Sequence, residues 1–145
     1  ANALALPNGT VVVTDQLIEM AKKDEEIIAV MAHEVGHIVN RHGLRMALQN
    51  SVIALVIAMV TGDVVSSSSI IVALPAVLIQ SGYSRAFEYE ADLYAYNYMK
   101  KNNINPNHFV AILERLTKRN VDSKVMNLIS THPSYKDRVK VFKKK

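Results

Sequence analysis

The chain contains no cysteine among its 145 residues. A disulfide framework, a thiolate metal site and a cysteine nucleophile are therefore all excluded. The sequence does not indicate the redox compartment of the protein, because a protein without cysteine suits oxidising and reducing environments equally. A chain of this length buries a core that needs no cross-links, so we expect residues 1–145 to form one domain.

Charge of one sign is in only mild excess. The 17 basic and 13 acidic side chains leave a formal charge of +4. Much of the excess lies in four lysines between positions 140 and 145, and a short basic tail is typical of a solvated chain end. The composition therefore predicts a globular protein that binds no nucleic acid.

The sequence also lacks an apolar run long enough to cross a bilayer, which takes roughly 20 residues. Residues 51–60 and 70–79 are apolar, but Asp63 and a run of serines separate them. Residues 51–80 therefore form either a buried or loosely packed helical hairpin or an element that contacts a membrane. No basic and apolar leader precedes the first predicted strand, so we expect a domain of a longer protein.

The elements that are present begin with a hairpin. Two short apolar runs, Leu4–Leu6 and Thr10–Val13, flank the turn sequence Pro7-Asn8-Gly9. Helical periodicity and capping residues then predict helices over about 15–22, 24–43, 84–101 and 106–118, with a short one after Pro133. The expected fold class is α+β and predominantly α-helical, with an active-site helix beside a small sheet that includes the N-terminal β-hairpin.

The central motif is HEVGH, at positions 33–37 of the second predicted helix. Residues four apart lie about 40° apart around a helix and about 6 Å along it, so His33 and His37 can bind one metal ion. Glu34 is placed beside them to activate an attacking water. Gly36 costs roughly 1 kcal/mol in a helix, which indicates that another backbone or a substrate approaches closely there.

A catalytic zinc site takes three protein ligands and leaves one position for water. The class with a third histidine six residues after His37 is excluded, because that position is Gly43. His42 would lie about 140° from His37 on a continuous helix, and we interpret it as a helix-end or core histidine.

Glu88 and Asp92 are four residues apart on a later helix and share a face. Glu88 can supply the carboxylate ligand, and Asp92 can accept the outward ring N–H of a zinc-bound histidine. The alternative is an ordinary salt-bridged face with Arg85. The HEVGH helix favours the interpretation as a ligand and its partner.

For each of two residues near the C-terminus, the sequence allows more than one role. His132 is a candidate for stabilising the oxyanion of the reaction, for closing the site as a fourth zinc ligand, or for fixing its loop. Arg138 is a partner for Asp92 or Glu88, or else a surface cation.

Four sequence blocks, NALALPNG, HEVGH, SRAFEYEAD and THPSYKDR, occur in this order along almost the whole chain. Together they resemble the gluzincin metallopeptidases of the CAAX-prenyl-protease and HtpX family. The resemblance implies one zinc ion with Glu88 as the third ligand. It also implies cleavage of membrane or envelope proteins, often as quality control. The lack of full-length spans favours smaller soluble or peripheral bacterial members, in the cell envelope.

We therefore predict a zinc endopeptidase whose polypeptide substrate adds as a strand to the hairpin edge at Ala3, Leu4 and Ala5. One competing hypothesis is a latent or chaperone-like zinc-binding domain that His132 closes. Another is a membrane-surface adaptor in which HEVGH is accidental. Nothing in the sequence indicates whether the protein is a monomer or an oligomer.

Overall fold

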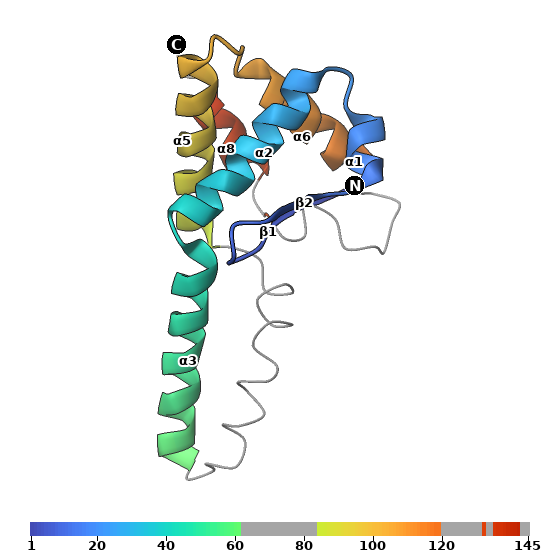
Figure 1. The fold of residues 1–145 in the computed structure, drawn as a ribbon. Helices are drawn as coiled ribbons and strands as arrows, with labels where there is room; N and C mark the ends of the chain where they lie inside the picture. The colour runs from blue at the N-terminus through green and yellow to red at the C-terminus, as the bar shows by residue number, and fades with distance from the viewer. Residues whose placement is uncertain (62–83, 120–131, 133–134, 143–145) are drawn as a thin grey trace.

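The computed structural model of the chain describes residues 1–61, 84–119, 132 and 135–142. These residues are predominantly helical and include a small antiparallel sheet, as the predicted fold class requires (Figure 1). The elements are β1 (Ala3–Ala5), β2 (Val11–Val13), α1 (Asp15–Met20), α2 (Asp24–Val39), α3 (His42–Thr61), α5 (Arg85–Lys101), α6 (Asn107–Arg119) and α8 (Tyr135–Phe142).

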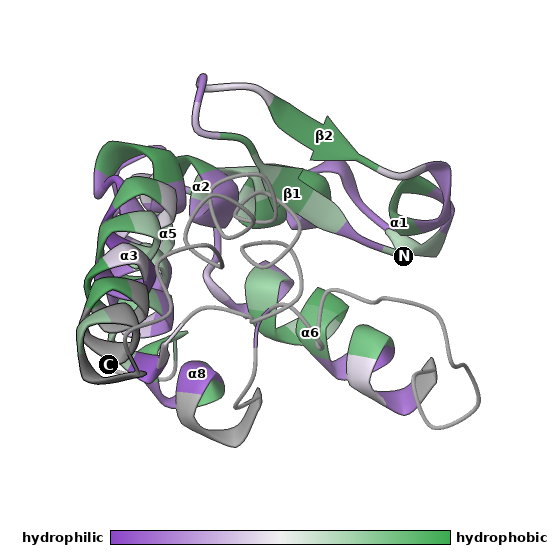
Figure 2. Cartoon of the chain, turned by 90° about the horizontal axis from the view of Figure 1, so that it is seen from below, coloured by the Kyte–Doolittle hydropathy of each residue, from purple (hydrophilic) through white to green (hydrophobic). Residues whose placement is uncertain are grey.

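The predicted hairpin is confirmed. β1 and β2 pair antiparallel, with Ala3 opposite Val13, and the Leu6 N–H donates to the Thr10 carbonyl across the turn at 2.8 Å. Gly9 takes φ +90, a conformation that a turn readily gives to glycine. Both strands are hydrophobic along their length, and β1 packs against α2 (Figure 2).

Local side-chain contacts mark the start of α5 and the end of α2. The Ser84 hydroxyl accepts a hydrogen bond from the Phe87 N–H and caps α5. The prediction that α2 continues to Gly43 is wrong, because α2 ends at Val39. There the Asn40 amide donates to the Gly36 carbonyl at 2.8 Å, and Arg41 turns the chain with φ 53.

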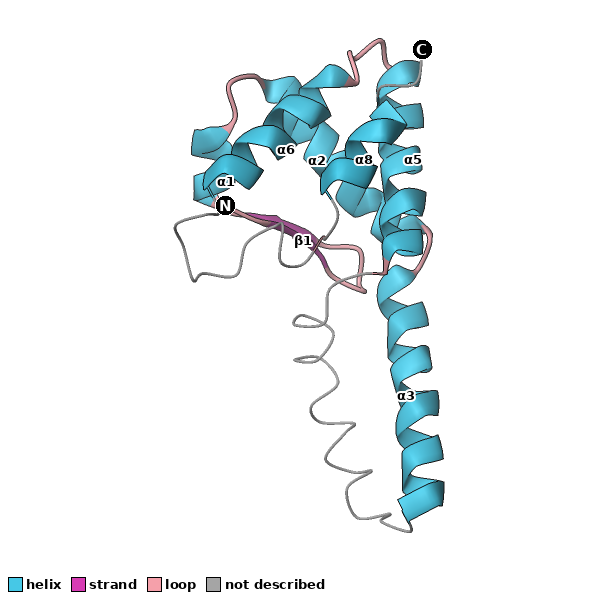
Figure 3. Ribbon diagram, turned by 180° about the vertical axis from the view of Figure 1, so that it is seen from behind, coloured by secondary structure: helices cyan, strands magenta, loops and turns pink. Residues whose placement is uncertain are grey.

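The hydrophobic core lies where α2, α5, α6 and α8 meet, on one side of the hairpin (Figure 3). Phe109 of α6 contacts Phe142 of α8 with ring centroids 4.5 Å apart. The most deeply buried apolar side chains of this core are Leu17, Ala29, Val30, Ala95, Met99, Phe109, Ile112, Leu113 and Leu116.

Gly36 sets the distance between α2 and α5. A Cβ atom at this position would lie 2.9 Å from the Cα of Ala91 and 3.0 Å from its carbonyl oxygen. The prediction of a close backbone approach is therefore confirmed, and the approaching backbone is that of α5. This contact brings the α5 carboxylates level with the α2 histidines.

Helix α3 extends away from the rest of the described fold (Figures 1 and 3). Among the side chains of α3 that the structure describes, the large apolar ones that are exposed are Leu44, Leu48, Val52, Leu55 and Met59. Within the described residues, no helix combines the length and the hydropathy that a bilayer crossing requires. The second apolar run of the sequence, residues 70–79, lies outside the described residues.

Candidate metal centre

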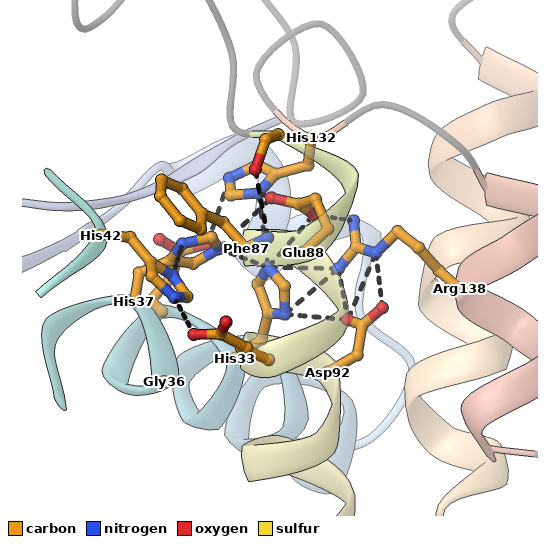
Figure 4. A network of polar contacts seen from close by, with 12 residues as sticks. His33, Gly36, His37, His42, Phe87, Glu88, Asp92, His132 and Arg138 are labelled. Carbon is orange, nitrogen blue, oxygen red and sulfur yellow. Dashed lines mark hydrogen bonds and ion pairs between the residues drawn. The ribbon is translucent and has the colours of Figure 1, made fainter. Parts of the chain in front are cut away.

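His33 and His37 leave the same face of α2, as their four-residue spacing requires. Their Nε2 atoms face each other at 3.0 Å, and both side chains are buried (Figure 4). Two metal-binding atoms therefore converge on one point inside the protein.

Glu88 of α5 and His132 complete this cluster. Glu88 places Oε1 at 3.4 Å from the His37 Nε2 and Oε2 at 3.7 Å from the His33 Nε2. The Nδ1 atom of His132 lies 2.8 Å from the Glu88 Oε1 and 3.3 Å from the His33 Nε2. All four side chains are buried, and they form a group that could hold a metal ion.

The spacing of these donor atoms fits zinc. Zinc binds nitrogen and carboxylate oxygen at about 2.0–2.2 Å in a tetrahedron, so neighbouring ligand atoms lie about 3.3–3.5 Å apart. The donor atoms of the cluster all lie within 4.8 Å of one another, and the closest pairs among them are 2.8 to 3.7 Å apart. Buried imidazoles and one carboxylate are also the ligand types that zinc takes.

Glu34 lies beside the cluster without joining it. Its Oε1 is 3.5 Å from the Nε2 of His132, and its side chain is fully buried. Among the described residues, the carboxylate faces His132 and the backbone of Ala5, whose N–H acts to lower the pKa of Glu34. A buried carboxylate of this kind is positioned to accept a proton from a group bound at the site.

Asp92 and Arg138 surround the cluster from the side of α5 and α8. The Asp92 Oδ1 lies 2.9 Å from the His33 Nδ1, where it can accept the ring proton opposite the converging Nε2 atom. Arg138 is buried and donates from Nε and a terminal nitrogen to Asp92, and its other terminal nitrogen lies 3.3 Å from the Glu88 Oε2. Arg138 is therefore placed as a partner of both carboxylates.

Burial sets the protonation of the cluster. It lowers the pKa of His33 well below its ordinary value and that of His37 to about 4, so both rings are neutral near pH 7. Burial alone would raise the pKa of Glu88, but the neighbouring His132 holds it below its usual range. Neutral imidazoles and an ionised carboxylate are the states that bind a metal.

The pKa values of Glu34 and His132 are raised, whereas those of Glu88, His33 and His37 are lowered. Burial raises the pKa of the Glu34 carboxyl, while the charge of His132 opposes the shift. Burial by itself lowers the pKa of His132, but Glu88 and Glu34 outweigh it and raise that pKa. Both pKa shifts therefore arise from burial combined with the charges packed around each group.

The sequence did not reveal a second set of contacts behind His37. His42, the first residue of α3, is buried, and its Nδ1 lies 2.9 Å from the His37 Nδ1. Its Nε2 lies 3.0 Å from the Glu90 Oε2, which also accepts a hydrogen bond from Arg45. The interpretation of His42 as a helix-end or core histidine is confirmed, because it begins α3 and is buried. Its contact with His37 was not predicted, because it depends on the chain turning at Asn40 and Arg41.

A pocket of about 380 Å³ opens next to the cluster. It runs from Ala5 and the hairpin turn past His37 to Arg41 and Leu44. A partly apolar hollow therefore lies beside both the end of β1 and His37 of α2. Within the described residues the sheet has two strands, so β1 pairs with β2 alone.

Known proteins are similar in sequence to this chain over almost its whole length. It is 33% identical over 144 residues to the mitochondrial metalloendopeptidase OMA1 of Arabidopsis thaliana, covering 97% of this chain and 28% of that protein. It is 31% identical over 141 residues to the metalloprotease LoiP of Escherichia coli, covering 94% and 55%. The metalloprotease YcaL of the same organism is also 31% identical, with the same coverage.

This chain thus spans between about a quarter and about half of the relatives' length. The model of peptidase family M48 matches residues 1–145. The chain therefore belongs to peptidase family M48, a family of metallopeptidases.

Proposed function

We propose that this chain is the catalytic domain of a zinc-dependent endopeptidase. The observation that carries the proposal is the convergence of His33, His37 and Glu88 on one buried point, with Glu34 beside it. The family and the names of its relatives support metal-dependent cleavage of polypeptides. The choice of zinc comes from the ligand types and their spacing.

His33, His37 and Glu88 would hold the ion, which supplies Lewis-acid activation of a water molecule and of the scissile carbonyl. Asp92 orients His33 through its ring Nδ1, and Arg138 holds Asp92 in place. Glu34 accepts the proton of the attacking water and passes it to the leaving amine. His132, whose Nε2 faces Glu34, donates a hydrogen bond to the developing oxyanion.

The substrate is an extended segment of an unfolded or envelope protein that adds to the edge of β1 at Ala3, Leu4 and Ala5. Strand addition satisfies the peptide main chain by backbone hydrogen bonds. The pocket from Ala5 to His37 supports this placement, because it offers space for a substrate side chain next to the cluster. The bacterial cell-envelope location stays a prediction from the sequence.

Contact with a membrane surface is part of the same proposal. The described part of residues 51–80 carries exposed apolar side chains at Val52, Leu55 and Met59. Apolar residues along one helix bind the interface of a bilayer when their area is large enough. Co-sedimentation with lipid vesicles should fall when Leu55 is replaced by glutamate, and binding that is unchanged would contradict the contact.

A second function rests on the position of His132. Its Nδ1 lies within the ligand cluster, 2.8 Å from Glu88, where it would close a zinc site as a fourth protein ligand. A closed site of this kind gives a latent or chaperone-like zinc domain.

Digestion of unfolded casein by the zinc-loaded chain separates the two functions, with Glu34→Gln as the matched variant. Cleavage by the wild type alone, with zinc bound to both, supports the endopeptidase. Stoichiometric zinc in both proteins with no cleavage by either supports the closed site. A wild type that binds no zinc contradicts both.

A further inference from the structure

His42 is buried at the start of α3, directly behind the proposed zinc ligand His37 (Figure 4). The two rings face each other through their Nδ1 atoms at 2.9 Å. On its other side, the His42 Nε2 lies 3.0 Å from the Glu90 Oε2. Three polar side chains from α2, α3 and α5 therefore form one continuous line that starts at the ligand cluster.

A short contact between two Nδ1 atoms needs one proton, carried by one ring and accepted by the other. The His37 Nε2 faces the cluster, so a metal bound there leaves the proton on the His37 Nδ1. The His42 Nδ1 must then accept it, which places the His42 proton on Nε2, pointing at the Glu90 carboxylate. With a metal on the His37 Nε2 and both rings neutral, only one arrangement of protons satisfies both contacts.

The surroundings hold the His42 ring in this orientation. Phe87 of α5 stacks on it with a centroid distance of 4.4 Å and an interplanar angle of 6°. The Arg45 guanidinium lies 4.4 Å from the centroid of Phe87 and donates to Glu90 at 2.8 Å. Glu90 is thereby fixed as the acceptor at the end of the line.

We infer that His42 is a positioning residue for the proposed zinc site, selecting with Glu90 the His37 tautomer whose Nε2 is free to bind the ion. The inference rests on the proposed function. It gives each α2 histidine its own carboxylate on α5: Asp92 contacts His33 directly, and Glu90 acts on His37 through His42.

The test is the zinc dissociation constant of the full chain, measured by competition with a chromogenic chelator. His42→Phe keeps the flat ring against Phe87 but cannot accept a hydrogen bond, so zinc affinity should fall about 10- to 100-fold. His42→Asn offers an acceptor oxygen near the Nδ1 position and should recover part of the loss. Glu90→Gln should also weaken zinc binding, because an amide replaces the charged acceptor.

The matched control is Glu114→Gln, which removes an exposed carboxylate that pairs with Lys118. Its zinc dissociation constant should equal that of the wild type. A wild type that binds no zinc would overturn the proposed function itself.

Zinc binding by the wild type with equal affinity in His42→Phe would overturn only the role of His42. An equal loss in His42→Phe and His42→Asn would also overturn it, because the hydrogen bond would then not be the cause. If neither His42 variant folds, an unchanged affinity in Glu90→Gln overturns the inference, and a weakened one supports it.

Discussion

The Nε2 atom of His132 lies 3.5 Å from the Oε1 atom of Glu34, and both side chains are fully buried. Glu34 comes from α2, near the start of the chain, and His132 from the segment before α8. In the proposed mechanism Glu34 is the proton acceptor and His132 the hydrogen-bond donor to the oxyanion. Their separate replacement therefore tests two different steps of the proposed reaction.

Replacing Glu34 with glutamine should leave zinc bound and reduce casein cleavage by about 10²- to 10⁴-fold. The reason is that glutamine keeps the shape of the side chain and cannot accept the proton of the attacking water. Zinc content and cleavage rate are measured on the same preparation. Full activity with a full complement of zinc would contradict the role of Glu34.

Replacing His132 with alanine should lower the cleavage rate by about 10²- to 10³-fold while zinc stays bound, because a donor to the oxyanion is lost. His108→Ala, on α6 and outside these contacts, is the control. A rise in rate in His132→Ala would instead support the closed, latent site.

Gly36→Ala should destabilise the protein, although alanine favours helix by about 1 kcal/mol. The added methyl group would overlap the Ala91 backbone of α5, and overpacking of this kind costs about 1–3 kcal/mol. Zinc affinity should fall as well, because α5 carries Glu88. The matched control is Gly43→Ala, whose Cβ would meet Pro7 at an ordinary 3.7 Å. The measurement is the urea midpoint of unfolding of each variant. Similar midpoints for Gly36→Ala and Gly43→Ala would refute this account.

Arg138→Met should lower the free energy of unfolding of the metal-free protein by about 3–5 kcal/mol, because it leaves buried carboxylates without their cation. Lys118→Met removes an exposed cation and should change that energy by about 1 kcal/mol or less. Denaturant melts compare the two variants. Similar losses in both would show that Arg138 does not stabilise the buried charges.

The stabilising contribution of His37 should shrink in acid. Its folded pKa of about 4 lies below the ordinary 6.5, so between these values the unfolded chain binds more protons. The contribution is therefore complete above pH 6.5 and is lost as the pH falls toward 4. The measurement is the difference in unfolding free energy between the metal-free wild type and His37→Gln at several pH values. A difference that grows toward acid would contradict the lowered pKa.

Local patterns in the sequence were sufficient for most of the fold. The hairpin and the start of α5 follow from turn residues and a serine cap, which act within a few positions. The predicted end of α2 was wrong. The Asn40 side chain and the positive φ of Arg41 end the helix, although the helical sequence pattern continues past them. A pattern records which residues favour helix but not where the chain turns.

The candidate site could be predicted as far as its residues share one helix. Spacing alone brings together His33 and His37, and likewise Glu88 and Asp92. The burial of Arg138 between Asp92 and Glu88, and the turn of His42 toward His37, depend on how separate helices pack. Neither of these contacts has a local sequence signal.

His33 and His132 are 99 positions apart, yet their ring nitrogens approach to 3.3 Å. An unfinished or misfolded copy of this chain offers only the two α2 imidazoles, which lack the carboxylate and the distant histidine. The proposed metal site is therefore complete only when Glu88 of α5 and His132 pack against α2. Under the proposed function, a copy of the chain that has not folded cannot cleave, so cleavage activity would itself report that the domain is folded.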